Sequence, residues 1–216
     1  IIQGSENAKF AEVCRNYGAL LYVDDAPGFA VIGESPSEEN PYGLRGNSIV
    51  RHLDETYDNL VLVGGFSKAY SSLLAFIACP TEVKQLLKVA APPYLYSGPS
   101  PVASLATVLS GFDVNERRGD ALRAHLYALS RRLLDALERL GVHTLNRSGF
   151  PVVEIPLRRD ERIGPVGRML FERGVYVTLA AFPLVPKHEV GFRVQLTAAN
   201  TEAEVDALIA AVEELT

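Results

Sequence analysis

The 216-residue sequence predicts an α/β fold in which a mostly parallel sheet is followed by a small α+β domain. Three observations support this: short apolar runs early in the chain, a long stretch of helical periodicity, and a final stretch in which strand and helix patterns alternate. We expect residues 1–100 to be part of a large α/β domain, residues 101–141 to be a long connecting helix, and residues 142–216 to be a small α+β domain.

The first apolar segments predict one helix and three strands. Apolar residues in helical spacing predict a helix over residues 7–17, which Gly18 ends. The run ALLYV at 19–23 is almost wholly apolar, as expected for a strand buried on both faces of a parallel sheet. The runs at 60–63 and 74–79 repeat this pattern, so we expect three core strands.

The later segments predict the connecting helix and the small domain. After the proline-rich stretch 91–101, a leucine face predicts a helix that runs to Gly141; it consists of Leu122, Leu126, Leu129, Leu133, Leu137 and Leu140. Beyond it the pattern predicts, in order, a strand at 152–157, a helix through 169–171, strands at 175–177 and 192–196, and a last helix at 202–215.

The composition excludes several classes of function. The formal charge of −5, with 21 basic and 26 acidic residues and no long run of like charge, argues against a nucleic-acid surface. No apolar run approaches the roughly 20 residues that span a bilayer. Cys14 and Cys79 are the only cysteines and form no paired metal motif, so we expect no metal, a reducing compartment and a cytoplasmic protein.

The stretch VGGFSKAY at 63–70 places Lys68 just beyond an apolar run, beside a serine and two glycines. Such a lysine has three common explanations: a solvated surface amine, a phosphate ligand, or an amine that forms a Schiff base. The phosphate loop of nucleotide-binding proteins is excluded because Ala69 and Tyr70 follow the lysine in place of Ser or Thr at the start of a helix. Taken alone, Lys68 is best explained as a surface residue.

Asp24 favours the Schiff-base explanation. It follows the strand at 19–23, 44 residues before Lys68 (68 minus 24), and ligands of open α/β sheets collect beyond the carboxyl ends of the strands. A pyridine cofactor held by a lysine needs a carboxylate at its ring nitrogen, and Asp24 is the candidate. In isolation Asp24 is better explained as a turn residue or helix cap than as a cofactor ligand.

Four segments together resemble a known family. The segments YVDDAPG (22–28) and GGFSK (64–68) resemble pyridoxal-phosphate enzymes of the aspartate-aminotransferase fold, and more narrowly the α-oxoamine synthase family. YLYS (94–97) is similar to that family's aromatic-Ser-Thr turn, and GFRVQLTAANT (191–201) to its late Leu-Arg-Ile stretch. The resemblance spans nearly all of the chain. It implies fold type I of the pyridoxal-phosphate-dependent transferases, with the C-terminal half of the large domain followed by the small domain.

The resemblance also implies roles for individual residues. Lys68 would form the Schiff base with pyridoxal 5'-phosphate and move protons at the substrate α-carbon. Asp24 would pair with the pyridine nitrogen, Ala26 would pack on the ring, and Ser67 would lie close to the phosphate. Ser97 would be a further cofactor ligand, although a turn rich in Pro, Ser and Gly needs no ligand to explain it.

Arg193 completes the implied site and points to the substrates. It would bind the substrate carboxylate as a fork, although an arginine on an edge strand is in isolation more often an ordinary surface cation. The implied reaction is the decarboxylative condensation of an amino acid with an acyl thioester, carried out by a homodimer. An aminotransferase on the same fold and a non-catalytic homologue acting as a partner subunit are the alternatives.

The sequence departs from the family pattern at four positions. Pro27 and Asn200 stand where the family has histidines, and Gly65 and Gly98 stand where it has threonines. These changes thin the hydrogen bonds to the cofactor and keep the non-catalytic alternative open. The long N-terminal part of the family has no counterpart here, so we expect the 216 residues to be a fragment.

Overall fold

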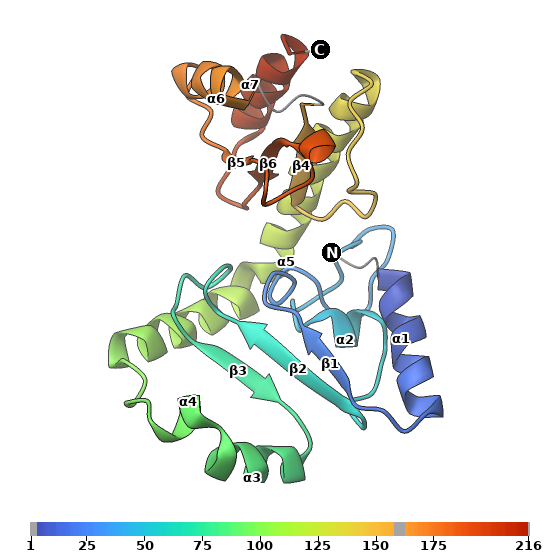
Figure 1. The fold of residues 1–216 in the computed structure, drawn as a ribbon, viewed down its shortest axis with the longest axis vertical. Coiled ribbons are helices and arrows are strands. Elements are labelled where there is room, and N and C mark those ends of the chain that lie inside the picture. Colours follow the sequence, from blue (N-terminus) through green and yellow to red (C-terminus); the bar gives the residue numbers. More distant parts are fainter. Residues whose placement is uncertain (1–3, 158–162, 216) are drawn as a thin grey trace. The chain divides into compact units, whose positions relative to one another are not determined.

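The computed structural model describes residues 4–157 and 163–215, which divide into two compact units after Arg123 (Figure 1). This boundary lies within the longest helix, α5 (Val102–Arg139), which is the connecting helix that the sequence predicts. The domain boundaries expected at residues 100 and 141 stay predictions. Across the described residues, no helix is long and apolar enough to cross a membrane.

The N-terminal unit is built on a three-stranded sheet with the order β1-β2-β3 (Figure 1). β1 and β2 are parallel, with Asp24 opposite Val63, whereas β3 runs antiparallel to β2. The elements are α1 (Gly4–Asn16), β1 (Leu21–Asp24), α2 (Ile49–His52), β2 (Leu60–Gly65), β3 (Ala75–Ala78), α3 (Thr81–Ala90), α4 (Pro92–Leu95) and the first part of α5.

Of the three strands that the sequence predicts to lie in the core, only β2 does so. Its residues are buried apart from the half-buried Val63, whereas Tyr22 of β1 is 64% exposed and Ile77 of β3 is 51% exposed. The expectation of three core strands buried on both faces is therefore wrong for β1 and β3. Both are edge strands of this sheet, and an apolar run cannot report whether one face or both faces of a strand are covered.

Two apolar clusters hold the N-terminal unit together. The first consists of Ile49, Val50, Leu60 and Leu62, so it packs the short helix α2 against β2. The second consists of Phe66, Tyr70 and Val108 and packs the turn that follows β2 against α5. This turn carries Lys68, for which the sequence predicts a role in binding the cofactor.

The C-terminal unit is an antiparallel sheet with the order β4-β6-β5 and packed helices. Its elements are β4 (Val152–Pro156), α6 (Ile163–Glu172), β5 (Thr178–Ala180), the 3-10 helix η2 (Lys187–Glu189), β6 (Gly191–Gln195), α7 (Glu202–Glu213) and the last part of α5. The leucine face of α5 is confirmed, since Leu126, Leu129, Leu133 and Leu137 are buried.

The strand expected at 175–177 is displaced to Thr178–Ala180. The Val175 N–H donates to the Leu170 carbonyl oxygen at 2.8 Å, and Gly174 has a φ of 77°. A left-handed glycine followed by a hydrogen bond back to the last turn is a common end of a helix. Val175 therefore belongs to the cap of α6, and the strand begins only after residue 177.

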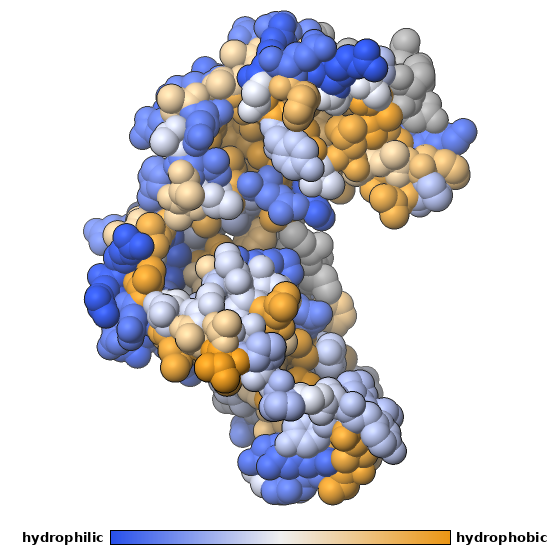
Figure 2. Space-filling model, turned by 90° about the vertical axis from the view of Figure 1, so that its left-hand side faces the viewer, coloured by the Kyte–Doolittle hydropathy of each residue, from blue (hydrophilic) through white to orange (hydrophobic). Residues whose placement is uncertain are grey.

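Apolar side chains remain exposed in parts of the molecule. Leu86 of α3 is 61% exposed and Val89 is 73% exposed. Figure 2 shows patches of apolar residues, in orange, on one face. Cys14 and Cys79 are both free thiols and both half-buried.

Candidate active site

Lys68 lies at the exposed tip of the turn after β2, and two buried aromatic residues hold the ends of that turn. Phe66 is 7% exposed and Tyr70 is 8% exposed, whereas residues 67–69 between them are exposed. The rings of Phe66 and Tyr70 meet edge to face with their centroids 5.3 Å apart. Among the described residues, the Lys68 ammonium group has no hydrogen-bond or ion-pair partner.

Further aromatic rings fix this turn to its surroundings. Phe29 packs on Phe66 at 5.5 Å and on Tyr70 at 6.0 Å between ring centroids. Phe112 of α5 packs on the same two rings at 5.8 Å and 5.3 Å. Aromatic pairs in such arrangements contribute beyond the burial of their area, so these contacts stabilise both ends of the segment that carries Lys68.

The two glycines before the turn allow close approach of neighbouring groups. A Cβ atom on Gly64 would lie 2.3 Å from the ring of Phe76, so only glycine lets β3 pack that ring across β2. A Cβ atom on Gly65 would lie 3.0 Å from the Ala26 Cβ and 3.8 Å from the Ser67 Oγ. The structure thus brings Ala26 and Ser67 together at Gly65, where the family pattern has threonine.

The two aspartates at the end of β1 lie in opposite environments. Asp24 is exposed and its Oδ1 accepts a hydrogen bond from the Ala26 N–H at 3.0 Å, whereas Asp25 is only 6% exposed. Burial raises the pKa of Asp25 from 3.8 to about 6; a hydrogen bond from the Ile49 N–H opposes this shift and the nearby charge of Asp24 adds to it.

Pro27 fits the turn that follows these aspartates. The N–H groups of Ala26, Gly28 and Phe29 all donate, the first to the Asp24 side chain and the other two to the Asp25 carbonyl oxygen. Residue 27 supplies none of these hydrogen bonds, so a proline there costs the turn no donor.

Arg193 and Ser97 lie in different parts of the chain. Ser97 is exposed in the loop after α4. Arg193 lies on the exposed face of β6 in the C-terminal unit, opposite Glu154 of β4 and Thr178 of β5. With its amide oriented to satisfy both groups, the Gln195 Oε1 accepts hydrogen bonds from the Arg193 Nε at 3.0 Å and Nη2 at 2.7 Å.

Asn200, which stands where the family has histidine, organises a turn. Its Oδ1 accepts hydrogen bonds from the Thr197 N–H at 2.9 Å and the Thr197 hydroxyl at 3.1 Å. The next residue, Thr201, begins α7 through a capping box with Glu204. The position therefore has a structural explanation that needs no ligand.

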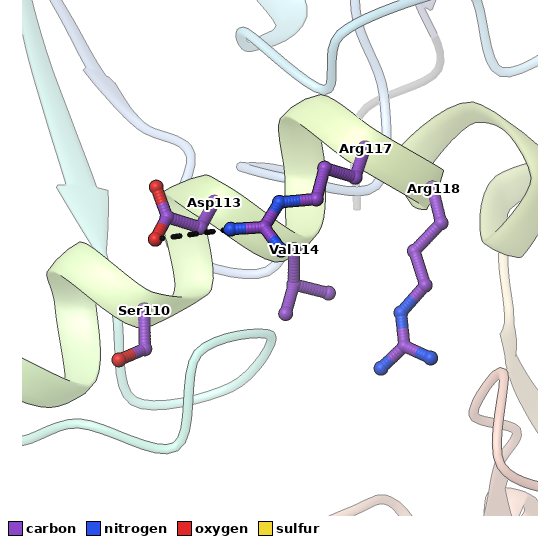
Figure 3. Close-up of a pocket in the computed structure, with 5 residues that line it drawn as sticks. All are labelled: Ser110, Asp113, Val114, Arg117 and Arg118. Carbon is purple, nitrogen blue, oxygen red and sulfur yellow. Dashed lines mark ion pairs between the residues drawn. The ribbon is translucent and has the colours of Figure 1, made fainter.

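One open pocket of about 450 Å³ lies on α5. Figure 3 shows Arg117 reaching back along the helix toward Asp113, at 3.6 Å, while Arg118 points away from this pair. The residues that line the pocket are Ser110, Asp113, Val114, Arg117 and Arg118, and none of the predicted site residues is among them.

Sequence reasoning missed two buried charged residues near the candidate site. One is Asp25, and the other is Arg123 of α5, which is 5% exposed. Arg123 donates to the Ala30 carbonyl oxygen at 3.0 Å and to the Asn115 Oδ1 at 2.7 Å, and forms an ion pair with Asp120. The sequence does indicate the burial of Arg123, because it lies three residues before Leu126 and therefore on the leucine face of the helix.

Comparisons with known proteins agree with this architecture. The family described as aminotransferase class I and II matches residues 4–212. The 8-amino-7-oxononanoate synthase of Pseudomonas putida (strain GB-1) is 33% identical over 205 residues, which cover 94% of this chain and 50% of that protein. The enzyme of the same name from Pseudomonas paraeruginosa (strain DSM 24068 / PA7) is 34% identical, covering 94% and 48%.

Solved structures share the fold. Serine palmitoyltransferase from Sphingomonas wittichii superimposes with a TM-score of 0.83 at 23% identity, covering 95% of this chain and 49% of that one. The 8-amino-7-oxononanoate synthase of Francisella tularensis gives a TM-score of 0.73 at 18% identity, covering 95% and 57%. The chain spans about half the length of the relatives it matches. It belongs to the aminotransferase class I and II family, and its resemblance to the α-oxoamine synthases, with the fold that this implies, is confirmed.

Proposed function

We propose that this protein uses pyridoxal 5'-phosphate to join an amino acid to an acyl thioester with loss of carbon dioxide. One observation carries the proposal: the paired parallel strands β1 and β2 lead, at the same end, to an exposed carboxylate on Asp24 and an exposed amine on Lys68. The sequence relatives, which are 8-amino-7-oxononanoate synthases, support the reaction type.

The chemistry of these residues fits the cofactor. Among the described residues, Lys68 has no partner and Asp24 accepts one hydrogen bond and forms no ion pair, so both are free to bind a ligand. The Ser67 hydroxyl lies beside Gly65, and Ala26 presents only a methyl group at the same place. The cofactor has four groups to bind, and each has a suitable partner here. Its aldehyde requires an amine, its pyridine nitrogen a carboxylate, its phosphate a hydroxyl, and the face of its ring a small apolar contact.

Each residue then has a chemical task. When bound, pyridoxal phosphate supplies a protonated ring that holds the electron pair released at the substrate α-carbon. The Asp24 carboxylate keeps the ring nitrogen protonated. The Lys68 amine would hold the cofactor covalently; once the amine of the substrate has displaced it, the free Lys68 amine would remove and return the proton at the α-carbon. Ser67 and Ser97 donate hydrogen bonds to the phosphate, and Ala26 packs on the ring.

Arg193 is assigned to the substrate carboxylate. Gln195 occupies the Nε–Nη2 edge of its guanidinium group, which leaves the Nη1–Nη2 edge for a bidentate carboxylate. Among the described residues, no ion pair competes for that edge. Charge-assisted bidentate pairs of this kind fix the orientation of a ligand as well as adding affinity.

The experiment that tests the cofactor assignment is an absorbance spectrum of the purified protein with added pyridoxal phosphate. We expect a visible band from lysine-bound cofactor in the wild type, its loss in Lys68→Ala, and its retention in Lys88→Ala, a matched exposed lysine on α3. A spectrum of free cofactor alone in the wild type and in Lys68→Ala would refute the catalytic proposal and favour a non-catalytic partner subunit.

The family also contains aminotransferases, as its description states. An aminotransferase would use the same Lys68 and Asp24 without an acyl thioester. Release of free coenzyme A from an acyl-coenzyme A in the presence of amino acids distinguishes the two reactions. Release that depends on Lys68 supports the condensation, and conversion of amino acid to oxo acid without release supports the transaminase.

The homodimer and the cytoplasmic location stay predictions. Exposed apolar residues support a protein partner on the N-terminal unit, where Tyr94 is 61% exposed, Tyr96 is 87% exposed and Val102 is 81% exposed. Light scattering coupled to size-exclusion chromatography tests the dimer, because a mass of twice the chain confirms it.

A further inference from the structure

Asp25 is a buried carboxyl group for which the proposed reaction has no task. Successive side chains of a strand point to opposite faces, so Asp24 faces outward at the end of β1 and Asp25 faces inward. Burying a carboxylate costs free energy unless hydrogen bonds compensate. The contacts of Asp25 should therefore show why it is there.

Those contacts join three segments of the N-terminal unit. The Asp25 N–H donates to the Val63 carbonyl oxygen of β2 at 2.9 Å, and its Oδ2 accepts from the Ile49 N–H at the start of α2 at 2.9 Å. Its own carbonyl oxygen accepts from Gly28 at 3.0 Å and from Phe29 at 2.8 Å. One residue thus ties the turn at 26–29 to both β2 and α2.

The second carboxyl oxygen packs directly against this turn. A Cβ atom on Gly28 would lie 2.1 Å from the Asp25 Oδ1, so the turn and the carboxyl group fit together only because residue 28 has no side chain. The same turn supplies the Ala26 N–H that donates to Asp24 at 3.0 Å. The Asp25 side chain therefore contacts the same turn whose Ala26 N–H is hydrogen-bonded to Asp24.

We propose that Asp25 is a positioning residue whose side chain, through Ile49 and Gly28, holds the 26–29 turn in the arrangement that presents Asp24 and Ala26 to the cofactor. This inference rests on the proposed function of Asp24. The side-chain contact depends on an oxygen acceptor and not on charge, because the donor is a backbone N–H group. Asn at position 25 retains that acceptor and Ala does not.

The test measures two properties of Asp25→Ala, Asp25→Asn and the wild type. The first is the dissociation constant of pyridoxal phosphate, from titration of the visible band. The second is the hydrogen-exchange rate of the Ile49 amide in cofactor-free protein. We expect Asp25→Ala to raise both by about tenfold or more, since a buried hydrogen bond is lost. Asp25→Asn should raise neither property by more than about threefold, because its amide oxygen replaces Oδ2.

A second variant leaves Asp25 itself unchanged. Gly28→Ala places a methyl group where the Oδ1 lies and should weaken cofactor binding in the same direction. It keeps the test decisive if Asp25→Ala does not fold. Asp58→Asn, in the exposed loop before β2, is the matched control and should leave both measurements unchanged.

Each outcome bears on a separate statement. Faster exchange at Ile49 with an unchanged dissociation constant in Asp25→Ala overturns the proposal, because the contact is then structural only. Equal weakening by Asn and Ala overturns the role of the oxygen acceptor. A wild-type protein without a Lys68-dependent band refutes the proposed function and the cofactor part of this inference, whereas the exchange rates still show whether Asp25 holds the turn.

Discussion

The two turns that leave β1 and β2 at the same end of the sheet are held by different forces. The turn after β1 is fixed by hydrogen bonds to Asp25, whereas the turn after β2 is fixed by the packing of Phe66 and Tyr70. The strength of a polar anchor depends on the exact positions of donor and acceptor, and that of an aromatic anchor depends on shape and buried area. The residues assigned to the cofactor's nitrogen and aldehyde are thus positioned by different kinds of interaction.

The two turns meet at two places. Phe29, which donates to the Asp25 carbonyl oxygen, packs on both Phe66 and Tyr70. Ala26 lies against Gly65 at the end of β2. A change in one turn can therefore reach the other through a ring contact or a methyl contact, and the following variants separate these effects.

The largest loss of stability should come from breaking the aromatic anchor. Phe66→Ala removes a buried ring that contacts four others, and truncations of this kind cost about 3–5 kcal/mol. Leu73→Ala, in the same loop but 88% exposed, should stay within about 0.5 kcal/mol of the wild type. Urea denaturation measures both. A loss below about 1 kcal/mol for Phe66→Ala would show that the aromatic contacts do not hold the turn.

The polar anchor should respond to pH where the aromatic anchor does not. Because the pKa of Asp25 is raised from 3.8 to about 6 on folding, its contribution to stability is complete below about pH 3.8 and is lost as pH rises through 6. A shift of this size corresponds to about 3 kcal/mol. The free energy of unfolding of Asp25→Asn, relative to the wild type, should thus increase by up to that amount between pH 4 and pH 8.

Phe66→Ala supplies the contrast for this measurement. Its loss of stability relative to the wild type should be the same at pH 4 and pH 8, since the ring does not titrate. A pH-independent difference for Asp25→Asn would contradict the burial of an ionisable group at position 25. Equal pH dependence in the two variants would show that the turns are not independently anchored.

The difference between the anchors also explains what the sequence could predict. The sequence predicts that Asp24 and Lys68 each follow a strand, since apolar runs mark strands and their ends carry the polar residues. The burial of Asp25 was not, because its partner is the backbone of Ile49, 24 residues away, and nothing local marks it. The exposure of Tyr22 and Ile77 was missed for a related reason: it depends on what covers a strand, and composition does not record this.

The methyl contact between the turns predicts a smaller effect. Gly65→Thr puts a Cβ atom 3.0 Å from the Ala26 Cβ, and such overpacking costs about 1–3 kcal/mol. Gly98→Thr is the matched control: threonine is again the family's residue, but a Cβ atom there would meet nothing within 4 Å. Thermal unfolding compares them. If Gly65→Thr is as stable as Gly98→Thr, the turn after β1 can move away from residue 65 without cost in free energy. Adding Ala26→Gly to Gly65→Thr should then not raise its stability.

The smallest effect on stability should come from the residue with the largest proposed role in catalysis. Lys68 lies in the exposed segment between the two aromatic anchors and has no partner among the described residues, so Lys68→Ala should change the free energy of unfolding by less than about 0.5 kcal/mol. The same variant should abolish the visible band of bound cofactor. A substantial loss of stability in cofactor-free Lys68→Ala would mean that the amine contributes to folding, and the missing band would then no longer identify a cofactor lysine. Unchanged stability with a lost band would place the structural task on Phe66 and Tyr70 and leave the amine to chemistry alone.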